Sequence, residues 1–228
     1  PYPLLNALHN MSLDEMVLLM EKDGTFRTGE AWPGVWTRDL SYAAVLSLAW
    51  LDPQRCMNSL MEKVADGRII QDTGTGGAWP VSSDRVVWAL AAWEIYKYTG
   101  DREWLAAAFE VVRNSLTADS KTIIDPLTGL IRGESSFLDW RKQTYPLWME
   151  PSDIYGSLNL GTNAAYFQAQ ITAGMMAREL GKEDMWSDRA TELRANINKH
   201  LWLDEKGYYG QYLYGRHFRS VSPRAEAL

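Results

Sequence analysis

Apolar and polar positions along the chain repeat as pairs of helices. Each pair opens with a segment that is apolar around most of its circumference, which is the pattern of a buried inner helix. The next segment carries apolar residues at helical spacing with charges between them, as on a half-exposed outer helix. The predicted inner helices span residues 37–51, 83–99 and 162–180, and the predicted outer helices span 54–66, 102–118 and 184–202. No strand pattern of comparable quality occurs.

Short links join the two helices of a pair, and long links join one pair to the next. Asp52-Pro53, Gly100-Asp101 and Gly181-Lys182-Glu183 carry the stop and cap signals of the short links. The long links are 67–82, 119–161 and 203–221, and extended pieces near 122–132 and 208–214 are candidate hairpins within them. An antiparallel stack places all long links at one end, and long loops in compact domains usually carry function. We therefore expect the functional site at this loop end.

The repeat predicts an all-α ring of inner helices inside outer ones. Three pairs are visible, and the serine cap and proline at Ser222-Pro223 predict the start of a fourth inner helix. Three pairs alone would leave apolar inner helices open to water, whereas a closed ring needs about twice as many. We expect residues 1–228 to form a single catalytic domain truncated at its C-terminus, with the rest of the barrel missing from this chain.

Composition narrows the classes of partner. Hydrophobic residues make up 46% of the 228 residues, enough for a sizeable core. The formal net charge of −6 without a basic stripe disfavours nucleic acid. No apolar run reaches the ~18 residues of a membrane helix, so no membrane partner is expected, and the single Cys56 excludes an internal disulfide. The 11 Trp and 11 Tyr fit either a Trp-rich core or rings that stack on sugars.

Carboxylates, arginines and aromatic residues gather at the predicted loop end. They fall in four clusters, at 32–39, 72–84, 133–146 and 208–217. In the first cluster, Arg38-Asp39 follows Trp36. The pair is either a local ion pair and helix cap or a fork of donors and acceptors for vicinal sugar hydroxyls. In the second, Trp79 is a candidate sugar contact, and Asp84 is either a helix cap or a sugar ligand.

The third cluster offers the two carboxyl groups that glycoside hydrolysis requires. Asp139 lies between Leu138 and Trp140, and apolar neighbours raise a carboxyl pKa and keep a general acid protonated. Glu134 is the second candidate catalytic carboxylate. The competing interpretation is a surface acid held by Arg141 or Lys142.

Further residues of this cluster complete the candidate site. We expect Trp140 to contact the substrate, and Arg141 and Tyr145 to support Asp139. The three histidines are scattered, and no zinc spacing, phosphate loop or serine-nucleophile motif occurs, so no metal or cofactor is expected.

Two of these motifs resemble those of the six-hairpin glycosidases, the (α/α)6 barrel group of glucoamylases, trehalases and processing α-glucosidase I. Trp36-Thr37-Arg38-Asp39 resembles the Trp-x-Arg-Asp segment of the glucoamylase type, which implies that Arg38 and Asp39 hold a terminal sugar. Residues 134–140 resemble the trehalase-type Glu-Ser-Gly-Trp-Asp segment, with one extra residue before the Asp, which implies that Asp139 is the general acid. The resemblance implies an (α/α)6 toroid, here about half of it.

The resulting prediction is an exo-acting glycoside hydrolase on α-linked gluco- or manno-configured oligosaccharides, with inversion suggested by the resemblance. The resemblance also implies that the catalytic base lies on a later hairpin. One alternative is a lyase, epimerase or phosphorylase on the same barrel. Another is a non-catalytic helical repeat that binds carbohydrate, because a fold alone does not fix a function.

Overall fold

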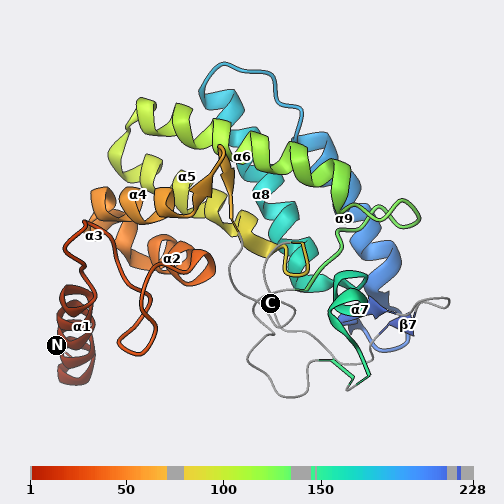
Figure 1. Cartoon of the computed structure of the whole chain (residues 1–228), viewed down its shortest axis with the longest axis horizontal. Helices are drawn as coiled ribbons and strands as arrows, with labels where there is room; N and C mark the ends of the chain where they lie inside the picture. The colour runs from red at the N-terminus through yellow and green to blue at the C-terminus, as the bar shows by residue number, and fades with distance from the viewer. Residues whose placement is uncertain (1, 71–79, 135–144, 147, 215–219, 222–228) are drawn as a thin grey trace.

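Three helical hairpins dominate the computed structural model, which describes residues 2–70, 80–134, 145–146, 148–214 and 220–221 (Figure 1). The first inner helix runs continuously through α2 (Thr37–Ala43), the π-helical turn η1 (Ala44–Leu48) and α3 (Ala49–Leu51), and its outer partner is α4 (Pro53–Glu62). The second hairpin consists of η2 (Asp84–Val87), α5 (Trp88–Thr99) and α6 (Arg102–Thr122), and the third of α8 (Leu160–Glu179) and α9 (Ser187–Leu201). The all-α class and the inner–outer pairing are confirmed.

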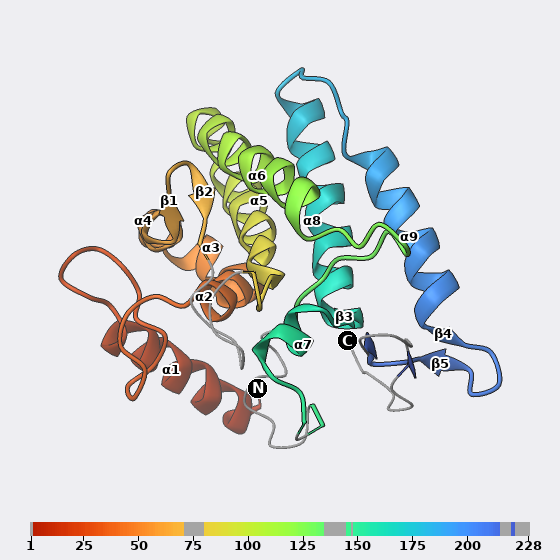
Figure 2. The same ribbon diagram turned by 45° about the vertical axis from the view of Figure 1, so that its right-hand side comes forward.

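The inner helices stand side by side. Helix α5 packs between α2 and α8, while α4, α6 and α9 cover them from outside (Figure 2). Trp88, Ile95 and Tyr166 on α5 and α8 are 0–1% exposed and form the centre of the core. By contrast, Leu46 and Trp50 on the first inner helix are 80% and 56% exposed. The apolar interior is therefore closed around α5 and α8 and open along the first hairpin.

The predicted capping residues lie at helix termini as expected, with Asp52 and Asp101 at the starts of α4 and α6 and Gly100 at the end of α5. Asp52 accepts a hydrogen bond from Arg55 N at 3.0 Å, and Asp101 accepts from Glu103 N and Trp104 N at 2.9 and 3.0 Å. Gly100 closes α5 in the left-handed conformation, with φ of 66°. These side chains satisfy backbone groups that a helix end leaves without partners.

Three predicted boundaries differ from the structure by three or four residues, and one of them is the start of α9, which begins at Ser187 (Ser187–Leu201) rather than at 184. Helix α4 ends at Glu62 rather than at 66, because Asp66-Gly67 forms the tight turn between β1 (Val64–Ala65) and β2 (Arg68–Ile69), with φ of 51° and 68°. A two-residue Asp-Gly loop with both φ values positive matches the twist of a hairpin. Helix α6 continues to Thr122 rather than 118.

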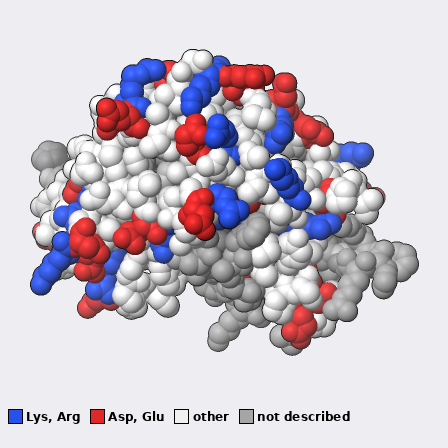
Figure 3. Space-filling view, turned by 45° about the horizontal axis from the view of Figure 1, so that its top comes forward, with Lys and Arg blue, Asp and Glu red and all other residues white. Residues whose placement is uncertain are grey.

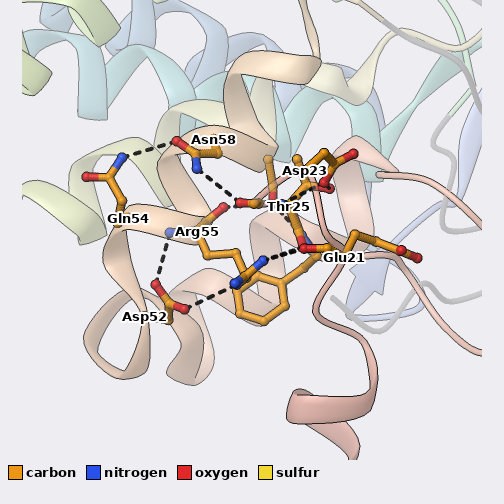
Figure 4. A network of polar contacts seen from close by, with 10 residues as sticks. Glu21, Asp23, Thr25, Asp52, Gln54, Arg55 and Asn58 are labelled. Carbon is orange, nitrogen blue, oxygen red and sulfur yellow. Dashed lines mark hydrogen bonds and ion pairs between the residues drawn. The ribbon is translucent and has the colours of Figure 1, made fainter.

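The sequence pattern did not predict two helices, the short α7 (Pro151–Tyr155) and α1 (Pro3–Leu18), which has no buried residue. A helix without a buried face carries no strong apolar stripe, so periodicity gives little signal. The loop after α1 is fastened to α4 (Figure 4). Arg55 donates to the carbonyls of Glu21 and Thr25 at 2.9 and 3.2 Å, and Asn58 donates to that of Gly24 at 3.0 Å.

One ion pair is buried inside the helical layer. Asp119 on α6 accepts from Arg85 Nη2 at 2.6 Å and from the Tyr166 hydroxyl at 2.7 Å. Arg85 and Asp119 are 4% and 1% exposed. Burial raises the pKa of Asp119, and the Arg85 charge opposes that shift. The three residues join η2, α6 and α8.

Two further observations concern the distribution of charge on the surface and the apolarity of the helices. Figure 3 shows charges of both signs interspersed over the face in view, without a single-sign patch. In the part of the chain that the structure describes, no helix combines the length and apolarity of a membrane span.

Candidate active site

Short strands and single β-bridges connect the loops at the N-terminal ends of the inner helices. Ser82 bridges Glu134, and Gly133 bridges Leu158. The row continues from β3 (Leu158–Asn159) to β6 (Tyr212–Tyr214) and then to β7 (Ser220–Val221), with α7 (Pro151–Tyr155) preceding β3. A separate pair joins β4 (Trp202–Leu203) to β5 (Tyr208–Tyr209). Residues 208–214 are extended and form antiparallel pairs as expected, although β5 pairs with β4 and β6 with β3 and β7 rather than β5 with β6. Residues near 122–132 also fold back, with Ile124 opposite Ile131.

Glu134 lies at the centre of this row. Its side chain is buried, with the residue 0% exposed, and its Oε1 accepts from the Ser82 hydroxyl at 2.8 Å. The backbone N–H of Glu134 donates to Val81 at 2.8 Å. Gly133 before it has φ of 103°, and a Cβ there would lie 2.5 Å from Ser83 Oγ. Only glycine fits that close approach. Gly133 therefore fixes the backbone position from which the Glu134 side chain projects.

Tyr145 is the second predicted site residue in this cluster. Burial raises the pKa of Tyr145 well above its usual value, and the charge of Glu134 adds to the shift. The ring packs against Tyr212, with centroids 5.3 Å apart. The structure thus brings Glu134 and Tyr145 together, although eleven positions separate them in the sequence.

An aromatic row leads from this cluster to the surface. Tyr212 meets Tyr214 at 5.4 Å between ring centroids, and Tyr214 meets Trp148 at 6.1 Å. Trp148 is 52% exposed, whereas Tyr212 is 3% exposed. Aromatic rings with one exposed end are suited to stacking on sugar faces. The sequence analysis noted the cluster at 208–217 but did not place it beside Tyr145.

Two buried side-chain amide oxygens near Tyr145 and Tyr212 lack a hydrogen-bond partner among the described residues. Asn159 Oδ1 and Gln211 Oε1 are buried and accept no hydrogen bond from the residues that the structure describes. Buried polar atoms in native proteins are normally paired. The cluster therefore has capacity for hydrogen bonds to a bound polar molecule. Ser82 and Gln211 fall within the predicted clusters 72–84 and 208–217 but had no assigned role, and Asn159 was not predicted at all, since each becomes relevant only through contacts with distant segments.

The predicted site residues Arg38 and Asp39 are consecutive in the first turn of α2 and lie close together for that reason. Arg38 Nη2 lies 3.3 Å from Asp39 Oδ2 at the start of α2. Trp36 packs against Trp32, with ring centroids 5.3 Å apart. Asp39 also lines a cavity of about 230 Å³ between α1 and the first inner helix, together with Arg27. This arrangement serves either as a helix-end ion pair or as a polar edge for a sugar.

Four predicted site residues, Trp79, Asp139, Trp140 and Arg141, lie outside the described residues. Asp84 begins η2, and its side chain is likewise outside the description. Glu134 and Tyr145 are the described residues on either side of 135–144. Among the described residues, no three or more His, Cys, Asp or Glu side chains are grouped so as to hold a metal ion.

Comparisons with known proteins give one matching family model and several solved structures of similar fold. The family model described as bacterial alpha-L-rhamnosidase 6 hairpin glycosidase domain matches residues 34–219. Among solved structures, the fold resembles GH63 mannosylglycerate hydrolase from Thermus thermophilus, with a TM-score of 0.64 and 16% identity over 88% of this chain and 67% of that chain. It also resembles the GH78 family rhamnosidase of Bacillus sp. GL1, with a TM-score of 0.55 and 20% identity over 89% of this chain and 21% of that chain. No curated protein matches.

Proposed function

The chain belongs to the bacterial α-L-rhamnosidase six-hairpin glycosidase family, and from that premise we propose that it hydrolyses α-linked, manno-configured sugars from a non-reducing end. The observation that carries the proposal is the cluster of the buried Glu134 and the half-buried Tyr145 beside an aromatic row that ends at the exposed Trp148. A glycosidase site needs carboxyl groups in a partly dry environment and a surface for the sugar ring. The loop end provides candidates for each.

The choice of sugar rests on the two structural relatives. One is named for mannosylglycerate and the other is a rhamnosidase. L-Rhamnose is 6-deoxy-L-mannose, so both names refer to the manno relative configuration with its axial 2-hydroxyl, although D-mannose and L-rhamnose belong to opposite enantiomeric series. We therefore favour the manno-configured class over the gluco-configured one for this chain. The chain spans about two thirds of the first relative and about a fifth of the second, so the activity of the whole protein is part of the proposal.

In the proposed mechanism, Asp139 protonates the departing glycosidic oxygen. Leu138 and Trp140 on either side favour its protonated form, because apolar surroundings disfavour a carboxylate. Arg141 and Tyr145 support Asp139. A general acid contributes about 10²–10⁴-fold to the rate.

The second carboxyl group would activate water or attack the sugar. Glu134 is the candidate within this chain. A pair of carboxyl groups about 6.5–9.5 Å apart leaves room for water and gives inversion, whereas about 5–5.5 Å gives retention. We propose inversion. Full burial and the hydrogen bond from Ser82 also suit Glu134 to holding Tyr145 and the start of the loop in place.

The remaining candidates would form the sugar subsite. Arg38 and Asp39 would bind vicinal hydroxyls, since a guanidinium and a carboxylate together supply donors and acceptors. Trp36, Trp79 and Trp140 would stack on the ring or border it, and Asp84 would add an acceptor at the start of the second inner helix.

The proposal is tested by incubating the full chain with aryl α-L-rhamnoside, aryl α-D-mannoside, aryl α-D-glucoside and mannosylglycerate. NMR follows the released sugar and its first anomer. Release of one manno-configured sugar as the inverted anomer is expected. Release of glucose alone would overturn the choice of sugar. An unsaturated product that absorbs in the ultraviolet would show that the enzyme is a lyase and not a hydrolase.

A further inference from the structure

A second cavity lies away from the loop-end cluster, where the outer helices α6 and α9 meet the inner helix α8. Its volume is about 300 Å³, at the lower end of the roughly 300–1,000 Å³ of small-molecule sites. One face of each helix lines it, at spacings of three and four residues. The lining side chains are Leu116, Asp119 and Ser120 from α6, Tyr166 and Gln170 from α8, and Arg189, Glu192 and Leu193 from α9.

The remaining wall is the segment that follows α6 and reaches across to α9 (Figure 2). It contributes Ile124, Gly129 and Ile131. Gly129 has φ of 70°, and a Cβ there would lie 2.3 Å from Asn196 Nδ2 on α9. Asn163 on α8 accepts from Ile131 N at 2.7 Å and donates to Ile131 O at 3.1 Å.

A buried carboxylate fixes the turn in that wall. Asp125 is 1% exposed and accepts from Thr128 N at 3.1 Å and Thr128 Oγ1 at 2.8 Å. Arg132 adds an ion pair at 3.0 Å. Hydrogen bonds thus hold the wall to α8 and fix its own turn, and Gly129 lies close to Asn196 on α9.

The floor of the cavity contains an incomplete hydrogen-bond network. Gln170 is 7% exposed, and its Oε1 is buried without a hydrogen-bond partner among the described residues. Asp119 beside it is already engaged by Arg85 and Tyr166. A buried amide that lacks a partner is costly unless a bound molecule or water completes it. Gln170 therefore points to a ligand that donates a hydrogen bond.

Charge and shape narrow the class of ligand. Asp119 is neutralised by Arg85, and Glu192 faces the same cavity as Arg189, so the formal charges balance. A balanced cavity favours a neutral ligand over an anion or a cation. Leu116, Ile131 and Leu193 provide apolar walls for the C–H faces of a ring, while Gln170 and Ser120 meet hydroxyls.

We propose that this cavity is a second, non-catalytic binding site for a neutral polyhydroxylated molecule of monosaccharide size. None of its lining residues belongs to the candidate active site, so the proposal does not depend on the hydrolytic activity proposed above. The cavity lies between α6, α8 and α9, and it shares no lining residue with the cluster of Glu134, Tyr145 and Tyr212.

The test is methyl NMR of the full chain during titration with methyl α-D-mannopyranoside, with inorganic phosphate as the charged comparison. The methyl groups of Ile124, Ile131 and Leu193 report on the cavity. Saturable shifts of these methyls with the glycoside and none with phosphate are expected. Gln170→Ala should weaken the binding at least about tenfold, since one or two hydrogen bonds are lost. Gln168→Ala, on the exposed face of the same helix, should not.

Two controls keep the result decisive. Glu192→Trp places a large ring on the exposed rim and should block binding even if Gln170→Ala fails to fold. Asp139→Asn should leave the cavity shifts intact, and Gln170→Ala should leave turnover intact, so failure of the two proposals is distinguishable. Absence of cavity shifts with the glycoside, phosphate binding in its place, or unchanged binding in Glu192→Trp would overturn the second site.

Discussion

Two buried carboxyl groups, Asp119 and Glu134, belong to regions built in different ways. Asp119 lies between packed helices and is held by Arg85 at 2.6 Å and Tyr166 at 2.7 Å. Glu134 lies among loops joined by single bridges, where a hydroxyl at 2.8 Å and a tyrosine surround it. The first arrangement fixes a charge to join three helices. The second places a buried carboxylate next to an aromatic row that reaches the surface at Trp148, which is where a ligand could be contacted.

The largest effect on the helical side of this comparison is expected from Asp119→Ala. The substitution leaves Arg85 buried without its carboxylate, and breaking a buried pair costs about 3–5 kcal/mol. Urea denaturation measures the loss, while turnover per folded molecule should stay at the wild-type level. The double variant Asp119→Leu with Arg85→Leu should recover part of the stability. A loss of turnover in well-folded Asp119→Ala would erase the proposed division between the two regions.

Glu134→Gln should show the reverse pattern. We expect turnover to fall about a hundredfold, within the range for a catalytic or orienting carboxylate, while the free energy of unfolding changes by about 1 kcal/mol. The pKa of Tyr145 should also drop, because the Glu134 charge contributes to raising it. Ser82→Ala, which removes only the hydroxyl donor to Glu134, serves as the milder matched variant. Wild-type turnover in Glu134→Gln would assign Glu134 to folding alone.

The same two regions show what sequence reasoning can reach. Gly100-Asp101 and Asp52 fix helix ends through contacts within a few residues, so their roles follow from local sequence. Helix α1 was missed because it lacks a buried face. The hairpin at Asp66-Gly67 was missed because Val64 continued the helical spacing of α4.

In the candidate site, too, the residues that could be predicted from sequence lie within short local motifs. Arg38 and Asp39 are neighbours in sequence, and Glu134 was noticed through its motif. Ser82 bonds Glu134 across 52 positions, and Tyr212 packs on Tyr145 from another loop. Such lateral contacts depend on how hairpins stand side by side, which apolar periodicity does not encode.

A smaller effect is expected at the first inner helix. Asp39→Asn should lower kcat/KM about tenfold, because one charge-assisted hydrogen bond to a sugar hydroxyl is weakened. Asp188→Asn, an exposed acid in the first turn of α9, is the matched control and should leave kcat/KM unchanged. Equal kinetics for both variants would remove Asp39 from the sugar subsite.

A last effect, which appears only at alkaline pH, concerns the buried thiol of Cys56 on the helical side. Burial raises the pKa of Cys56 from 9.0 to about 12. The folded state therefore keeps its proton where the unfolded state loses it, so this thiol contributes a fall in stability as pH rises from about 9 to 12. Below that window it contributes no slope. Comparing urea midpoints of wild type and Cys56→Ala across pH 8–11 should give a shallower decline for the variant, and parallel curves would contradict the buried-thiol assignment.

The central claim is that Asp139 supplies the proton to the leaving group, and the dependence of rate on the leaving group tests it most directly. Asp139→Asn is compared with wild type on two α-configured aryl glycosides of the preferred sugar, one with a dinitrophenyl leaving group and one with a simple phenyl. A general acid is needed for the poor leaving group and much less for the good one. The account predicts a loss of about 10³-fold or more on the phenyl glycoside and a far smaller loss on the dinitrophenyl glycoside. Equal losses on both substrates, or wild-type activity on the phenyl glycoside, would contradict it.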